Sequence, residues 1–241
     1  MKPPGLAFSG RVTVGDTVLL GPVAVRAEPG RWTCLLGPSG MGKSTLLHCL
    51  AGLTDGLNLD GRIEAGDGRP LAGRVALMAQ SDGLLPWLTV AQNVTLGARM
   101  RREAPDRDRA RALLARVGLT DLAGRKPHAL SGGQRQRAAL ARTLYEDRPV
   151  VLLDEPFSAL DVATRARMQD LAAAELGGRT VLHVTHDPAE AARLGERILI
   201  LTAGGIETID PEGAAPIPRV PDDPDTLSTT GRLTRLLLEV A

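Results

Sequence analysis

A glycine-rich segment at residues 37–45 has the residue types that bind a polyphosphate. It reads Gly-Pro-Ser-Gly-Met-Gly-Lys-Ser-Thr, follows an apolar run at 32–36 and precedes an apolar helical pattern. Strand, glycine turn and helix in this order are the context that a G-x-x-x-x-G-K-[ST] motif requires. Glycines let successive backbone N–H groups point inward, and the helix N-terminus adds donors and a positive dipole end. The segment is therefore predicted to cradle phosphate groups; the alternative is a turn that binds nothing.

Two side chains in this segment argue against a simple turn. Lys43 supplies a full positive charge for the outer phosphates, and the Ser44 hydroxyl is suited to Mg²⁺. A turn that binds nothing needs neither group. The predicted phosphate-binding residues are Gly37, Pro38, Ser39, Gly40, Met41, Gly42, Lys43, Ser44 and Thr45.

Two adjacent carboxylates, Asp154 and Glu155, follow the apolar run at 150–153. Ligands of open α/β sheets bind at the carboxyl ends of such strands. Asp154 is suited to hold Mg²⁺, and Glu155 is suited to polarise or deprotonate an attacking water. The alternative, in which the pair caps a following helix, must accommodate Pro156 directly after it.

A Ser-Gly-Gly-Gln segment opens a helical pattern at Ser131, Gly132, Gly133 and Gln134. Serine is a favoured residue at the position that caps a helix N-terminus. Taken alone, the segment fits an N-cap with a flexible turn as well as it fits a binding motif.

The order of these motifs resembles the nucleotide-binding subunit of an ABC transporter, of the bacterial importer type. In chain order they are the glycine-rich segment 37–45, Gln80, the Leu-Ser-Gly-Gly-Gln signature at 130–134, Asp154 and Glu155, the segment 158–161, and His186. The resemblance covers about residues 6–205. It is specific because almost no other P-loop ATPases share the signature.

The resemblance implies an α/β P-loop NTPase fold with a mostly parallel sheet, an N-terminal antiparallel β subdomain and an inserted helical subdomain. Residues 1–84 and 147–210 are expected to form the core with the β subdomain, 85–146 the helical subdomain and 211–241 a tail. The residue patterns agree, with alternating strands before residue 30 and apolar strands with a crossover helix after 150. The tail is expected to contain a segment at 211–224 that is a surface loop or is loosely ordered, and a short helix at 233–240.

The resemblance also assigns roles to single residues. Lys43 would contact the phosphates, Asp154, Ser44 and Gln80 would contact Mg²⁺, and Gln80 would also contact the water. Glu155 would be the catalytic base. His186 would contact the γ-phosphate, although a lone histidine after a strand is more often an ordinary surface or core residue.

The signature implies a second ATPase subunit. In this family Ser131, Gly133 and Gln134 face ATP bound to the opposite subunit, and Asp161 communicates across the dimer. A homodimer, or a dimer with a closely related chain, is therefore expected to enclose two ATP.

Further partners follow from the same resemblance. The segment at 80–90 is expected to contact a membrane permease, with Leu85 and Trp87 exposed, although Trp87 could instead pack within the helical subdomain. A solute-binding protein would act through the permease, which places the chain at the cytoplasmic face of the inner membrane as a peripheral subunit. The Leu-Leu-Pro-Trp sequence in this segment is similar to that of ATPases from bacterial importers of nitrate, sulfonates, taurine and thiamine precursors. The alternative function is that of a cell-division regulator. A P-loop kinase is disfavoured, because the signature would have no function in such an enzyme.

Composition is consistent with this reading. The chain of 241 residues is 43% hydrophobic and 24% charged with a formal net charge of +1, and it has no apolar run long enough for a membrane span. The balanced charge predicts no nucleic-acid partner, although the arginine-rich run at 99–116 leaves that alternative to a solvated helix face open. Cys34 and Cys49 are expected to be buried reduced thiols.

Few aromatic residues are present to stack on an adenine base. The family's usual aromatic position corresponds to Val14, and Phe8 is the nearest N-terminal aromatic residue. Weak or differently arranged base stacking is therefore predicted.

His48, His128 and His183 are expected to be ordinary structural residues.

Overall fold

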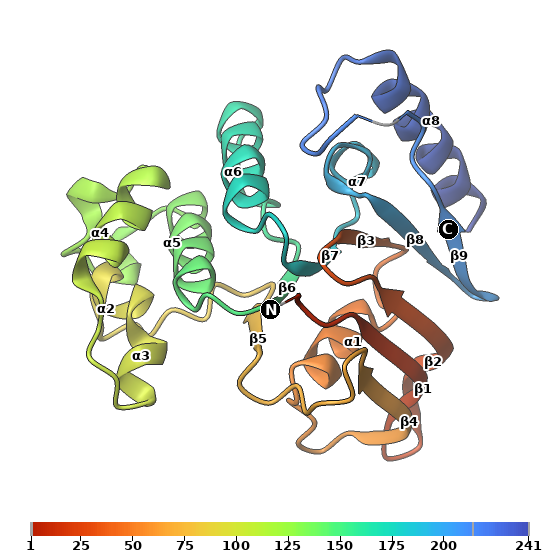
Figure 1. The fold of residues 1–241 in the computed structure, drawn as a ribbon, viewed down its shortest axis with the longest axis horizontal. Helices are drawn as coiled ribbons and strands as arrows, with labels where there is room; N and C mark the ends of the chain where they lie inside the picture. Colours follow the sequence, from red (N-terminus) through yellow and green to blue (C-terminus); the bar gives the residue numbers. More distant parts are fainter. Residues whose placement is uncertain (1, 214, 241) are drawn as a thin grey trace. The chain divides into compact units, whose positions relative to one another are not determined.

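The computed structural model describes residues 2–213 and 215–240. These residues form two compact units (Figure 1). The sheet unit comprises the described residues of Met1–Leu77, Arg148–Glu155 and Gly177–Ala241, and the helical unit comprises Met78–Asp147 and Pro156–Leu176. The subdomain boundaries expected from the sequence stay a prediction.

The larger sheet has the strand order β5-β6-β7-β3-β8-β9. The strands are β3 (Trp32–Leu36), β5 (Val75–Met78), β6 (Val150–Asp154), β7 (Thr180–Val184), β8 (Arg197–Thr202) and β9 (Gly205–Ile209). Neighbours among β6, β7, β3 and β8 pair in parallel, whereas β9 is antiparallel to β8. Every residue of β3, β6 and β7 is buried, as expected for apolar strands that are covered on both faces. The predicted α/β fold with a mostly parallel sheet is confirmed.

A second, antiparallel sheet has the order β2-β1-β4, formed by β1 (Leu6–Val14), β2 (Thr17–Ala27) and β4 (Asn58–Ala65). Gly10 lies opposite Gly61 in this sheet, and a Cβ on Gly10 would lie 2.3 Å from the Asp60 carbonyl oxygen. Only glycine therefore fits there. The expected N-terminal antiparallel strands are present and are longer than expected.

One hydrophobic cluster joins the two sheets and the helix α1 (Lys43–Leu50). Phe8 belongs to this cluster, which also contains Leu35 and Leu182, and has 1% of its surface exposed. Phe8 is therefore unavailable for base stacking, because its ring is enclosed by the core. Val14 is 44% exposed at the end of β1.

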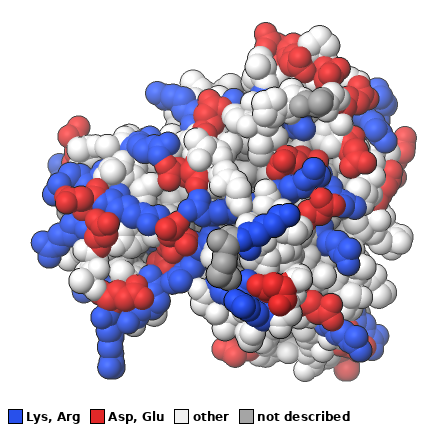
Figure 2. Space-filling view, in the orientation of Figure 1, with Lys and Arg blue, Asp and Glu red and all other residues white. Residues whose placement is uncertain are grey.

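The helical character predicted for residues 90–146 is confirmed. The elements of the helical unit are α2 (Val90–Val94), α3 (Leu96–Met100), α4 (Arg107–Arg116), α5 (Gly132–Tyr145), α6 (Val162–Glu175) and two 3₁₀ turns at Thr120–Leu122 and Pro127–Ala129. Leu113 and Leu114 of α4 are buried, while arginines on the outer face pair with acids, as in Arg109–Asp147. Figure 2 shows basic and acidic side chains interspersed on the face in view. The ion pairs that arginines of the run form with acids favour the solvated-face interpretation of that run.

The C-terminal part of the sheet unit differs from the expectation. Helix α8 (Pro224–Glu239) begins nine residues before the predicted start at Leu233, and Figure 1 shows it beside α7 (Pro188–Leu194). The Asp223 side chain accepts a hydrogen bond from Thr226 N, and proline occupies the first turn. Both are helix-start signals that fix the N-terminus earlier.

The segment before α8 is a loop in its described residues, as expected, and a buried arginine anchors it. Arg219 is 6% exposed, and its Nη1 donates to the carbonyl oxygens of Ala192 at 2.9 Å and Gly195 at 2.8 Å. Carbonyl oxygens at a helix C-terminus have no hydrogen-bond donor within the helix. At the end of α7, the Arg219 guanidinium is the donor for two of them. This contact holds the segment against the unit.

Within the described residues, no helix is long and apolar enough to cross a membrane.

We expect Arg219→Ala to lower the free energy of unfolding by about 1–3 kcal/mol, because two buried carbonyls would lose their donor. Urea denaturation followed by circular dichroism measures this change. The matched control is Arg235→Ala, since Arg235 is exposed on α8. Equal stability of the two variants would contradict the assigned role.

Candidate functional site

The glycine-rich segment forms a tight loop that opens α1. Gly40 and Gly42 have φ angles of 82° and 84°, and a Cβ on Gly42 would lie 2.2 Å from the Leu19 carbonyl oxygen. Gly42 is the N-cap of α1 and provides no side-chain hydrogen bond. The N–H groups of the first turn therefore remain available as donors, together with the positive end of the helix dipole.

Lys43 lies against this loop and is 7% exposed. Its Nζ donates to the carbonyl oxygens of Gly37 at 2.7 Å and Pro38 at 2.8 Å. Burial lowers the pKa of Lys43, while the nearby charges of Glu155 and Asp154 oppose that shift. The ammonium group is thus held where an anion in the loop would meet it.

Asp154 ends β6 and is 3% exposed. Burial is the largest influence on this carboxyl and raises its pKa, while a hydrogen bond with the Ser44 side chain lowers it. The described residues contain no group of three or more His, Cys, Asp or Glu side chains that could hold a metal. One carboxylate and one hydroxyl nevertheless suit Mg²⁺, which takes oxygen ligands and usually keeps water or phosphate in its other positions.

Glu155 follows directly and has a strained backbone, with φ at 47°. A residue other than glycine in this region costs about 1–3 kcal/mol, and such strain clusters at functional sites. Its N–H donates to the Val184 carbonyl oxygen at 2.9 Å, and its Oε1 lies 3.1 Å from His186 Nδ1. The sheet unit therefore brings Lys43, Asp154, Glu155 and His186 into one cluster with Ser44.

The remaining predicted site residues lie in the helical unit. Ser131 and Gln134 form a capping box at the start of α5, in which Gln134 N donates to Ser131 Oγ at 3.2 Å and Ser131 N donates to Gln134 Oε1 at 2.8 Å. Within one chain, the signature is thus an N-cap. Gly132 and Ser131 are exposed at this helix end.

The start of α5 packs against the segment at 158–161. A Cβ on Gly133 would lie 3.1 Å from the Ala159 carbonyl oxygen, so a larger residue would crowd this contact. Gln136 Nε2 donates to Ser158 Oγ at 3.2 Å, and Gln136 Oε1 accepts from Ala159 N at 2.9 Å. Asp161 is exposed and caps α6 by accepting from Thr164 N.

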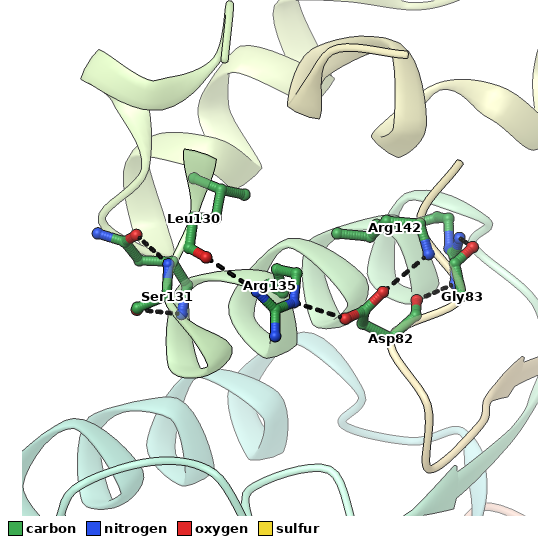
Figure 3. A network of polar contacts seen from close by, with 8 residues as sticks. Asp82, Gly83, Leu130, Ser131, Arg135 and Arg142 are labelled. Carbon is green, nitrogen blue, oxygen red and sulfur yellow. Dashed lines mark hydrogen bonds and ion pairs between the residues drawn. The ribbon is translucent and has the colours of Figure 1, made fainter. Parts of the chain in front are cut away.

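Gln80 is exposed. The segment after it is held by a network of polar contacts that the sequence did not predict (Figure 3). Arg135 Nε donates to Asp82 Oδ2 at 2.9 Å, and Arg135 Nη1 donates to Leu130 O at 2.9 Å. Arg142 donates to the carbonyl oxygens of Asp82 and Gly83. The two arginines are seven positions apart and share one face of α5, which is the sequence signal that could have indicated them.

Comparisons with known proteins agree with this geometry. The family model described as ABC transporter matches residues 20–158. The Paracoccus denitrificans protein named Aliphatic sulfonates import ATP-binding protein SsuB 1 is 42% identical over 92% of this chain and 89% of its own length. The Mesorhizobium japonicum protein named Thiamine import ATP-binding protein ThiQ is 45% identical over 72% of each chain.

Among solved structures, the ATP-binding cassette MJ0796, described as a dimeric post-hydrolysis state bound to ADP and Pi, has a TM-score of 0.75 and is 30% identical. The match covers 87% of this chain and 100% of that chain. The predicted resemblance and the predicted ATPase activity are confirmed. The chain therefore belongs to the ABC transporters, as an ATP-binding subunit that hydrolyses ATP.

Proposed function

We propose that this ATPase drives the import of a small solute through a membrane permease, in the class of nitrate, sulfonates, taurine and thiamine precursors. The observation that carries the proposal is the likeness to ATP-binding proteins named for sulfonate and thiamine import, which extends over most of the chain. No observation favours the alternative of a cell-division regulator. The chain would lie at the cytoplasmic face of the inner membrane, and a solute-binding protein would reach it through the permease.

The site residues are proposed to act on Mg-ATP as follows. The loop N–H groups and Lys43 bind the phosphates, while Ser44, Asp154 and Gln80 hold Mg²⁺. The ion, when bound, neutralises charge on the β- and γ-phosphates. The contact between the Ser44 hydroxyl and the buried Asp154 carboxylate supports this donor set, because both are hard oxygen ligands.

Glu155 is proposed as the general base that takes a proton from the attacking water, and His186 as the group that contacts the γ-phosphate. The 3.1 Å contact between Glu155 Oε1 and His186 Nδ1 supports this assignment, because it shows that both side chains reach one point. Phosphoryl transfer depends mainly on positioning and charge neutralisation, and a pair of side chains in contact contributes to positioning.

A second copy, or a closely related chain, is proposed to complete each site. Ser131 and Gly132 are exposed at the N-terminus of α5, where a helix end offers donors to an anion. Gly133 and Gln134 belong to the same helix end, and Asp161 is exposed nearby in the same unit. In the dimer these groups would face the nucleotide of the other subunit.

The helical unit is proposed to receive a cytoplasmic helix of the permease at the segment 80–90, as predicted from the sequence, and a groove that begins directly after this segment is proposed to extend the surface. A groove of about 680 Å³ lies beside α2 and α4, with an apolar floor that includes Leu114 and Ala110 and a basic lining of Arg99, Arg107 and Arg111. This lining favours a helix that carries acidic side chains. Trp87 is 65% exposed, which excludes the alternative that it packs inside the unit, and Leu85 is half-buried.

We expect Glu155→Gln to lower ATP hydrolysis by about 100-fold or more, because the amide cannot accept the proton from water. Phosphate release measures hydrolysis, and a fluorescent ATP analogue measures binding, which should be retained. Glu239→Gln, at an exposed position on α8, serves as the control. Near-normal turnover of Glu155→Gln would remove Glu155 from the role of base.

Reversal of charge in the groove tests the permease proposal. We expect Arg107→Glu with Arg111→Glu to prevent co-purification with the permease while the ATPase activity of the isolated chain stays unchanged. The control is Arg232→Glu, an exposed residue of α8. Undiminished recovery of the permease would show that the groove is not the docking site.

The solute class is tested with the intact transporter in membrane vesicles. Uptake of radiolabelled taurine, nitrate or a thiamine precursor, dependent on ATP inside and on the solute-binding protein outside, would support the proposal. Failure of all these solutes would contradict the proposed solute class and leave the ATPase assignment intact.

A further inference from the structure

A buried polar cluster lies below the residue proposed to contact the γ-phosphate. It consists of His183 and Thr185, at 0% and 2% exposed, with Glu190 at 6% and Trp32 at 2%. Polar and ionisable groups are costly to bury unless they have partners, so such a cluster inside an apolar sheet requires an explanation. The roles derived above use none of these four side chains.

Glu190 connects two parts of the cluster. Its Oε2 accepts a hydrogen bond from Thr185 Oγ1 at 3.0 Å, and its Oε1 lies 2.9 Å from His183 Nε2. Thr185 Oγ1 in turn accepts from Asp187 N at 3.1 Å. The two residues that flank His186 in the chain are therefore both held, directly or through one hydroxyl, by the Glu190 carboxylate.

The orientation of His183 is set from β3. Trp32 Nε1 donates to His183 Nδ1 at 3.3 Å, and the two rings meet edge to face at a centroid distance of 5.9 Å. Because Nδ1 accepts from the indole, the proton of a neutral ring is on Nε2, which faces Glu190. A chain of polar contacts thus runs from β3 through His183 and Glu190 to the loop that carries His186.

We propose that Glu190 and His183 are positioning residues that hold His186 in reach of Glu155. The inference rests on the proposed role of His186 in hydrolysis. The loop is also tied to neighbouring strands, since Thr185 N donates to Leu35 O at 3.2 Å and Glu155 N donates to Val184 O at 2.9 Å. These backbone hydrogen bonds hold the end of β7 between its two neighbouring strands. The Glu190 contacts then hold the loop at residues 185–187, which follows that strand end.

Thr185 offers the sharpest test, because its hydroxyl is the group that joins Glu190 to the loop. Thr185→Val removes the hydroxyl at nearly the same volume, and Thr185→Ser retains it. We expect Thr185→Val to lower kcat for ATP hydrolysis about 10-fold with ATP affinity unchanged, as a small misplacement of a reacting group lowers rate without lowering binding. Thr185→Ser should restore most of the rate.

Glu190→Gln should act in the same way, because its amide cannot replace both contacts of the carboxylate. The matched control is Glu196→Gln. Glu196 also supports β3, since its Oε2 accepts from Trp32 N at 2.7 Å, but this contact is at the opposite end of the strand from residue 185. Glu196→Gln should leave kcat within about twofold of the unchanged protein.

The decisive measurement combines these changes with His186→Ala. If Glu190 and Thr185 act by positioning His186, Thr185→Val and Glu190→Gln should lower kcat further by less than about twofold once His186 is absent. An equal loss with and without His186 would overturn the inference, because a general loss of order would produce it. An unchanged kcat of Thr185→Val, alongside a large loss in His186→Ala, would overturn this inference and leave the proposed role of His186 intact. Normal turnover of His186→Ala would overturn the proposed role of His186 and the inference together.

Discussion

Parallel pairing of β3, β7 and β6 is the constraint on which the site depends. In this register Leu35 lies beside Val184, and Val184 lies beside Asp154. The three strands therefore end at one level, so the glycine loop, the two carboxylates and the loop of His186 leave the sheet together. A parallel sheet places all its carboxyl ends on one edge, where a ligand can meet several loops at once. The chemistry depends on this register because a shift of one residue would move each functional side chain to another face.

Burial of charge is the second feature of the molecule. Lys43, Asp154 and Glu190 are each less than 10% exposed, and each has a specific partner from the loop, from α1 or from β7. Such groups have lost most of their hydration, so their geometry is strongly specified by the few contacts that remain. A site that must meet a polyphosphate in a fixed position gains from this rigidity.

Arginine stabilises many ends of elements in this chain. Arg109, Arg137 and Arg219 each donate to backbone carbonyl oxygens in the last turn of a helix or just beyond it. These carbonyls have no donor within their own helix, and a planar guanidinium can reach two of them at once. Aromatic residues are only 2% of the chain. Buried leucine and alanine pack its core instead, and arginine fixes the segments between the elements.

The local features of the site could be predicted because neighbouring residues create them. The glycines, Lys43 and Ser44 act within one loop, and the apolar strand before Asp154 is visible in the chain itself. Helix α8 begins earlier than predicted because Asp223 and Pro224 are a local helix-start signal, whereas the apolar positions that predicted the helix begin only at Leu233. Burial of Phe8 and exposure of Trp87 were open questions, because hydrophobicity alone does not say which aromatic ring the core will enclose.

The family, the glycine loop and the residue types gathered beside it follow from the chain alone, since motif order and spacing are properties of the sequence. Which distant groups meet depends on the fold. Asp82 and Arg135 are 53 positions apart, and Trp32 and His183 are 151 positions apart. No local pattern indicates such a partner, because the contact depends on strand order, register and helix face. Glu190 therefore appears in the sequence as an ordinary helical acid, and the fold alone places it under the loop of His186.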